Sequence, residues 1–150
     1  MEKLIFDSGI KEYQINGKGV LRFNPSDPNV YGRFMEAMDK IKAVEKKMAA
    51  KANAIDTTKG DQHTGETTLR IMCDTDKQMK AILNEIFGHE NDFDKILEGV
   101  NLMAVATNGK RVVTNLIEAL QPIMESGAKM CASGEVEEAK LNRAQRRAMQ

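Results

Sequence analysis

The hydrophobic period of this chain changes abruptly at Asp27-Pro28, and that change limits the fold more than any other feature. Before it, apolar residues around Tyr13 and Val20 flank Asn16-Gly17. Asn-Gly between β-prone runs favours a hairpin, because both central residues of a type I′ turn need positive φ. After it, apolar residues recur every three or four positions, which is the period of an amphipathic helix. The sequence therefore predicts a β-hairpin within residues 1–24, followed by helices.

The predicted hairpin needs support from elsewhere in the chain, because two strands alone are only marginally stable in water. A covering helix or a third strand would supply it. Leu4-Ile5-Phe6 is a short apolar run ahead of the hairpin and could form that third strand.

Helical segments are expected throughout the rest of the domain. Asp27 can cap the first helix, and Pro28 suits its first position. Residues 56–66 contain no large apolar side chain, which predicts a mobile loop. The apolar pattern predicts helices from Pro28 to about Ile55, from about Leu69 to a stop at Gly88, over 92–98 and over 110–125. The expected fold class is mainly α (α+β), with the N-terminal hairpin packed on a bundle of about four helices.

Two junctions in the second half of the chain allow more than one interpretation. Asn91 can cap the short helix that follows it, whereas residues 100–106 are apolar but ambiguous in type. Pro122 should kink or end the helix in which it lies. Lys110 and Arg111 would occupy the first turn of that helix, where the helix dipole disfavours cations. Either the helix begins earlier, or these two cations face a partner.

The C-terminal segment differs from the rest in composition. Gly127 and Ser133-Gly134 loosen the chain before it, and acidic residues then precede basic ones, as the dipole of a short helix favours. Its apolar face is too thin to dock firmly, so a flexible helical tail is expected. The predicted organisation is a single domain over 1–132 and a basic-ended tail over 133–150.

Charge and composition exclude several classes of protein. The chain has 22 basic and 22 acidic residues, so it lacks the overall positive charge of a nucleic-acid-binding domain. No apolar run reaches the length of a membrane span, and the start does not resemble a signal peptide. Cys73 and Cys131 have no metal-like spacing, which is typical of free thiols in a reducing cytoplasm.

The candidate catalytic residues form no recognisable set. His89 lies near Glu90, Asp92 and Asp94, but no second nitrogen or thiolate ligand accompanies it, and His63 lies in a distant polar segment. These acids are better explained as turn and capping residues. Sequence signatures of serine, cysteine and lysine nucleophiles are missing. The sequence therefore predicts no enzymatic activity, no metal and no cofactor.

Four segments carry a resemblance to a known family: Leu21–Tyr31, Phe87–Leu102, Asn115–Pro122 and Leu141–Ala148. They resemble small proteins from the tail modules of tailed phages and prophages of Gram-positive bacteria, identified as tail assembly chaperones of phages with long non-contractile tails. The resemblance extends from residue 4 to residue 148, and its motifs are structural. The resemblance implies a helix-rich protein of the host cytoplasm that coats the tape-measure protein, recruits tail-tube subunits and is absent from the mature virion.

A chaperone of this kind would need a surface that accepts a helix of its partner. An apolar groove rich in methionine could receive such a helix, and the chain contains ten methionines. Its expected lining is Phe87, Phe93, Leu97 and Met103, although core packing is favoured for each of them taken singly. Residues expected to bind a partner through the tail are Leu141, Arg143, Arg146 and Arg147.

Two other functions stay open at this point. A structural tail protein retained in the virion would usually contain more β structure. A small nucleic-acid-binding regulator would work through the tail arginines, although three arginines without aromatic neighbours make only a modest phosphate-binding patch. Self-association is also left open.

Overall fold

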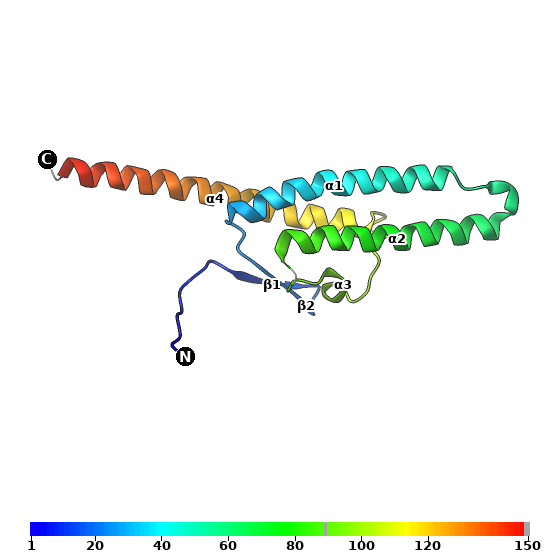
Figure 1. Ribbon diagram of the computed structural model, residues 1–150, viewed down its shortest axis with the longest axis horizontal. Coiled ribbons are helices and arrows are strands. Elements are labelled where there is room, and N and C mark those ends of the chain that lie inside the picture. Colours follow the sequence, from blue (N-terminus) through cyan, green and yellow to red (C-terminus); the bar gives the residue numbers. More distant parts are fainter. Residues whose placement is uncertain (89, 149–150) are drawn as a thin grey trace.

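The computed structural model describes residues 1–88 and 90–148, without the side chains of residues 135–140. Within these residues a two-stranded hairpin lies against four α-helices (Figure 1). The elements are β1 (Lys11–Ile15), β2 (Gly19–Phe23), α1 (Pro28–Asn53), a 3₁₀ turn (Thr57–Lys59), α2 (Asp61–Phe87), α3 (Phe93–Ile96) and α4 (Val112–Ala148). The predicted mainly helical fold with an N-terminal hairpin is therefore confirmed.

The hairpin turns where the sequence predicts. β1 and β2 pair antiparallel, from Lys11 opposite Phe23 to Ile15 opposite Gly19. Asn16 and Gly17 have φ of 50° and 82°, and the Lys18 amide donates to the Ile15 carbonyl at 3.1 Å. The positive φ values are those that an Asn-Gly turn supplies at low cost.

Of the two kinds of support expected for the hairpin, the described residues contain the covering helices and not the third strand. Residues 4–6 form no strand, and Leu4, Ile5 and Phe6 are 88%, 88% and 74% exposed. The sheet contains β1 and β2 alone among the described residues. The hairpin obtains its cover from helices instead, because Leu21 and Phe23 pack into the helical core.

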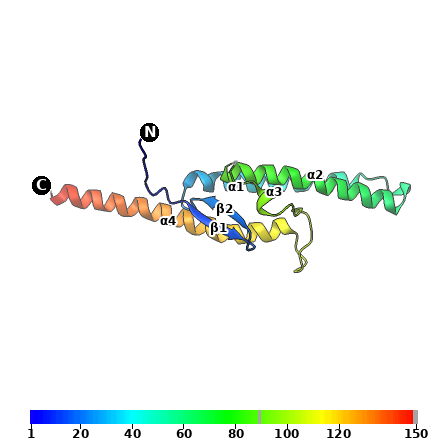
Figure 2. The ribbon, with the colours of Figure 1, turned by 90° about the horizontal axis from the view of Figure 1, so that it is seen from below.

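α1 and α2 run antiparallel as a long helical hairpin (Figures 1 and 2). The Asp27 side chain caps α1 by accepting a hydrogen bond from the Asn29 amide at 2.9 Å, as predicted. The predicted loop over 56–66 is partly wrong, because α2 already begins at Asp61. A helix that has formed extends at little cost, and side-chain bonds such as Gln62 to Glu66 support this polar first part.

α4 is longer than the sequence pattern indicates. It begins at Val112 and passes through Pro122 and Gly134 to Ala148 without a break. Pro122 deprives the Glu118 carbonyl of its helical donor, but both residues are exposed, so water can bond with that carbonyl. One continuous helix therefore joins the predicted domain (1–132) to the predicted tail (133–150).

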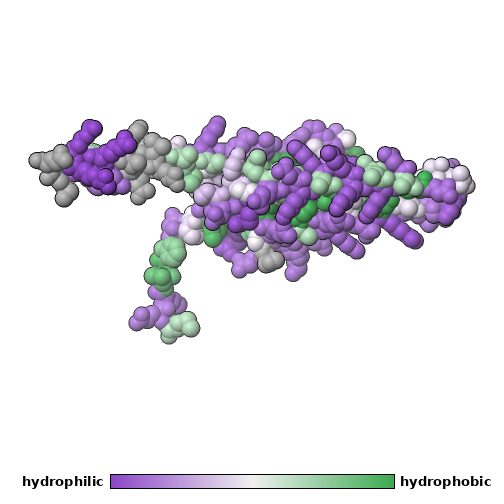
Figure 3. Space-filling model, turned by 45° about the horizontal axis from the view of Figure 1, so that its top comes forward, coloured by the Kyte–Doolittle hydropathy of each residue, from purple (hydrophilic) through white to green (hydrophobic). Residues whose placement is uncertain are grey.

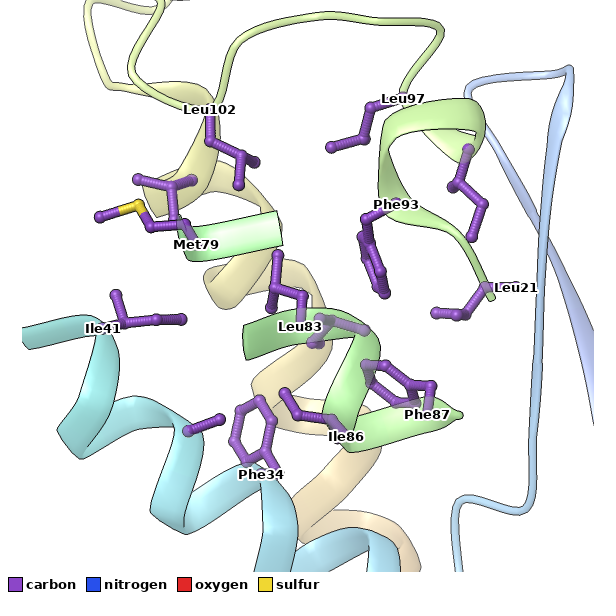
Figure 4. Packing of buried hydrophobic residues seen from close by; sticks show 14 of the residues in the cluster. Leu21, Phe34, Ile41, Met79, Leu83, Ile86, Phe87, Phe93, Leu97 and Leu102 are labelled. Carbon is purple, nitrogen blue, oxygen red and sulfur yellow. The ribbon is translucent and has the colours of Figure 1, made fainter. Parts of the chain in front are cut away.

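The core lies where the hairpin, α3 and the adjoining parts of α1, α2 and α4 meet (Figure 4). α2 contributes Met79, Leu83 and Ile86, all fully buried. Loop residue Leu102 is also fully buried and fills the space between α2 and α4. Among the described residues, no helix is both long and apolar enough to cross a membrane.

Two glycines permit close backbone contacts within this arrangement. A Cβ atom on Gly127 of α4 would collide with the Pro25 carbonyl, and one on Gly19 would collide with the Ile96 carbonyl. Gly127 therefore seats α4 against the turn before α1, whereas the sequence pattern suggested that it loosens the chain.

Candidate partner-binding surfaces

The four residues expected to line a groove lie together in the core. Phe93 is 1% exposed, and Phe87, Leu97 and Met103 are each less than 10% exposed. Phe87 stands between Phe23 and Phe93, with ring centroids 4.7 and 5.7 Å away. The structure thus brings these residues together as a packed cluster (Figure 4) and not as an open groove.

Asn91 has a role that the sequence pattern missed. Its side chain accepts a hydrogen bond from the Arg22 amide and donates to the carbonyls of Arg22 and Phe87, each at 2.8 Å. Asn91 does not cap α3, although the sequence suggested that it could. The cap is Asp92, whose carboxylate accepts a hydrogen bond from the Asp94 amide. Asn91 thus joins the end of α2 to the outer edge of β2. A single polar residue between two acids carries no sequence signal for this long-range contact.

A cluster of charged side chains, with Lys80 and Asp76 buried and Asp94 exposed, joins α2 to α3 and to the loop before α4. The Lys80 ammonium lies 3.0 Å from Asp76 and 2.7 Å from Asp94, and Asp76 also accepts the Leu102 amide. Burial alone would lower the pKa of Lys80, but the hydrogen bonds that its ammonium donates to Asp94 and Asp76 outweigh burial and raise that pKa. The hydrogen bond from Lys80 lowers the pKa of Asp94. All three groups are paired, so the cluster is suited to holding the elements together.

The cations before α4 are both used within the chain. α4 begins just after them, at Val112, so the alternative of an earlier helix start is wrong. Lys110 pairs with Glu118 at 3.0 Å, and Arg111 donates to the Met103 carbonyl. These contacts fix the loop before α4 to the helix itself.

The C-terminal end of α4 is the most exposed of the predicted partner-binding segments. It extends beyond the rest of the molecule in two perpendicular views (Figures 1 and 2). Leu141 is 59% exposed, and Arg143, Arg146 and Arg147 are all exposed. The helix thus presents one apolar and three cationic side chains to solvent.

The hollows found between described residues do not gather a catalytic set. Two of them, of about 410 and 400 Å³, lie between β1 and α4. Among the described residues, no group of three or more His, Cys, Asp or Glu side chains could hold a metal ion. His63 lies in the first turns of α2, and His89 lies outside the described residues.

Comparison with protein-family models, with curated protein sequences and with solved structures gives no match to this chain.

Proposed function

We propose that this protein is a phage tail assembly chaperone that binds the tape-measure protein, recruits tail-tube subunits and catalyses no reaction. One observation carries the proposal. The end of α4 leaves the core and presents Leu141 beside Arg143, Arg146 and Arg147. A free helix with an exposed apolar anchor can lie against an amphipathic helix of a partner.

The charge of this helix end favours an acidic strip on the tape-measure helix. Three exposed arginines follow Leu141 within two turns, and arginine can form paired hydrogen bonds with carboxylates. Such charges mainly set the rate of encounter and the choice of partner, while the apolar contact holds the complex together. The core residues Phe87, Phe93, Leu97 and Met103 would act as the frame that holds the first half of α4.

Co-purification with the tape-measure protein encoded by the same phage tests the proposal. We expect the full chain to co-purify and a chain ending at Ala132 to lose at least nine-tenths of the bound partner, with its thermal midpoint unchanged. Replacing Arg143, Arg146 and Arg147 with alanine should weaken binding about tenfold and make the remainder less sensitive to salt. As a control, alanines can replace Lys42, Lys46 and Lys47, which are exposed on α1. These changes remove the same amount of charge and should not weaken binding of the tape-measure protein.

Other outcomes would favour other functions. Full binding by the shortened chain would place the partner surface on α1 and α2, and aggregation would make the tail part of the core. Recovery of the protein in purified virions would favour a structural tail protein. A salt-dependent DNA mobility shift that needs the three arginines would favour a nucleic-acid-binding regulator.

A further inference from the structure

One face of α4 is only partly covered by the hairpin. Six of its residues follow one another at steps of four and three, so they share a face of the helix. Half of them are partly buried, and the other half are exposed. They line the two hollows beside β1 and are Val112, Leu116, Ala119, Ile123, Ser126 and Met130. We call this set the α4 stripe.

The strand beside the α4 stripe has a free edge. The Arg22 amide and carbonyl bond with Asn91 and so point away from β1. Backbone groups alternate in direction along an antiparallel pair, so those of Glu12, opposite Arg22, point away from β2. No hydrogen bond among the described residues reaches the backbone amide or carbonyl of Glu12 on that side. A further strand can therefore pair with β1 and cover the stripe.

The first seven residues have the composition of such a strand. Leu4, Ile5 and Phe6 are exposed, and this N-terminal arm (residues 1–7) leaves the body as an apolar extension (Figure 3). In an extended chain Leu4 and Phe6 point to one side and Ile5 to the other. At about 3.3 Å per residue, seven residues can span the length of β1.

The base of the arm directs it away from its own hairpin. Gly9 has φ of +75°, and its amide donates to the Asp7 carboxylate at 2.8 Å. The Asn24 side chain donates to the Ser8 carbonyl at 3.0 Å. These bonds hold residues 7–9 in an open conformation, so the arm does not fold back along β1 (Figures 1 and 2).

We propose that the N-terminal arm of a second copy forms the third strand, so that two chains dimerise by exchanging their arms. Paired antiparallel, Leu4 would lie beside Tyr13, Ile5 beside Glu12 and Phe6 beside Lys11 of the other copy. Leu4 and Phe6 then cover the α4 stripe, and the Glu12 backbone obtains its missing partners. Each copy gives an arm and receives one, so the contact closes on itself.

Engineered cysteines test this pairing directly. In a Cys73→Ser, Cys131→Ser chain, Ile5→Cys with Glu12→Cys would place two thiols on adjacent strands, within disulfide reach. Mild oxidation should convert most of the protein to a covalent dimer on a non-reducing gel. As a matched control, Ile5→Cys with Arg22→Cys puts the second thiol on the same exposed face but one strand further away, so it should link at least tenfold less.

The mass of the full chain in solution provides the second measurement. Light scattering should give twice 16.7 kDa, and Leu4→Ser with Phe6→Ser should halve that mass without unfolding the helices. Leu69→Ser, at an exposed site on α2, should leave the dimer intact. A monomeric full chain, a disulfide within one chain, or a dimer that does not cross-link would each overturn the inference. These experiments need no partner, so their result is independent of tape-measure binding.

Discussion

The two halves of α4 behave differently, although one uninterrupted helix contains both. In the first half Leu120 and Met124 are buried in the core and Gly127 is buried against the turn before α1, whereas Leu141 in the second half is exposed. Helix geometry alone does not mark where packing ends. The difference comes from what lies beside the helix, so the same residue type should have very different effects in the two halves.

The largest contrast should come from two glycines of α4. Gly127→Ala should cost more than about 4 kcal/mol of stability, because its Cβ would collide with the Pro25 carbonyl and the helix would have to move. Gly134→Ala meets no atom within 4 Å and should stabilise the chain by about 0.5–1 kcal/mol through helix propensity. Denaturant unfolding followed by circular dichroism measures both. Equal effects would mean that the two halves pack alike.

Two leucines give the next contrast. Leu120→Ala removes a side chain that is 3% exposed and should cost about 2–5 kcal/mol, whereas Leu141→Ala should change stability by less than about 0.5 kcal/mol. Because alanine favours helices, neither change should disturb the backbone. The comparison fails if Leu141→Ala lowers the denaturation midpoint as much as Leu120→Ala does.

A polar contact tests how far the packed region extends beyond α4. Asn91→Ala removes three hydrogen bonds between α2 and β2 and should cost about 2–3 kcal/mol. Asn108→Ala, which removes only exposed side-chain contacts and one amide bond, serves as the control and should cost less than about 1 kcal/mol. A neutral Asn91→Ala would show that the hairpin holds its position without this residue.

The pH dependence of stability should give the smallest effect. The pKa of Asp94 is lowered by its bond with Lys80, so its contribution is present above about pH 4 and is lost as pH falls through the lowered pKa. The pKa of Lys80 is raised, so its contribution is present below pH 10.5 and is lost at higher pH. Asp94→Asn should therefore flatten the acid side of the stability profile.

Urea titrations at several pH values measure this slope. Asp74→Asn, at an exposed carboxylate of α2 with no ion pair among the described residues, should keep the acid slope of the unaltered chain. An unchanged slope in Asp94→Asn would mean that the ion cluster does not contribute to acid stability.

Local signals predicted most of the fold. Asn16-Gly17, Asp27-Pro28 and Gly88 each act on the backbone within a few residues, so the hairpin turn, the start of α1 and the end of α2 were all predicted correctly. Contacts between distant segments were not predictable in this way. Asn91 and Gly127 owe their roles to neighbours 69 and about 100 positions away, and no local pattern marks those neighbours.

The candidate site shows the same limit. Phe87 and Phe93 were proposed as a groove lining, with core packing as the alternative, because their apolar character suits a partner as well as a core, and only tertiary contacts distinguish the two. The run at residues 4–6 was considered as a possible third strand from its composition, but the conformation at Gly9 directs it away from its own hairpin. Sequence thus indicated which residues are apolar, while neighbours determined which surface each one covers.

The bond pattern of Asn91 also makes the small sheet directional. The side-chain amide of Asn91 bonds with both the backbone amide and the carbonyl of Arg22. The outer edge of β2 therefore cannot recruit another strand, while the outer edge of β1 can. Strand addition is thereby confined to one side, which prevents the sheet from growing outward in both directions as an amyloid-like stack does. An Asn91→Ala chain would expose a second template, and the expected cost is aggregation at concentrations that the unaltered protein tolerates.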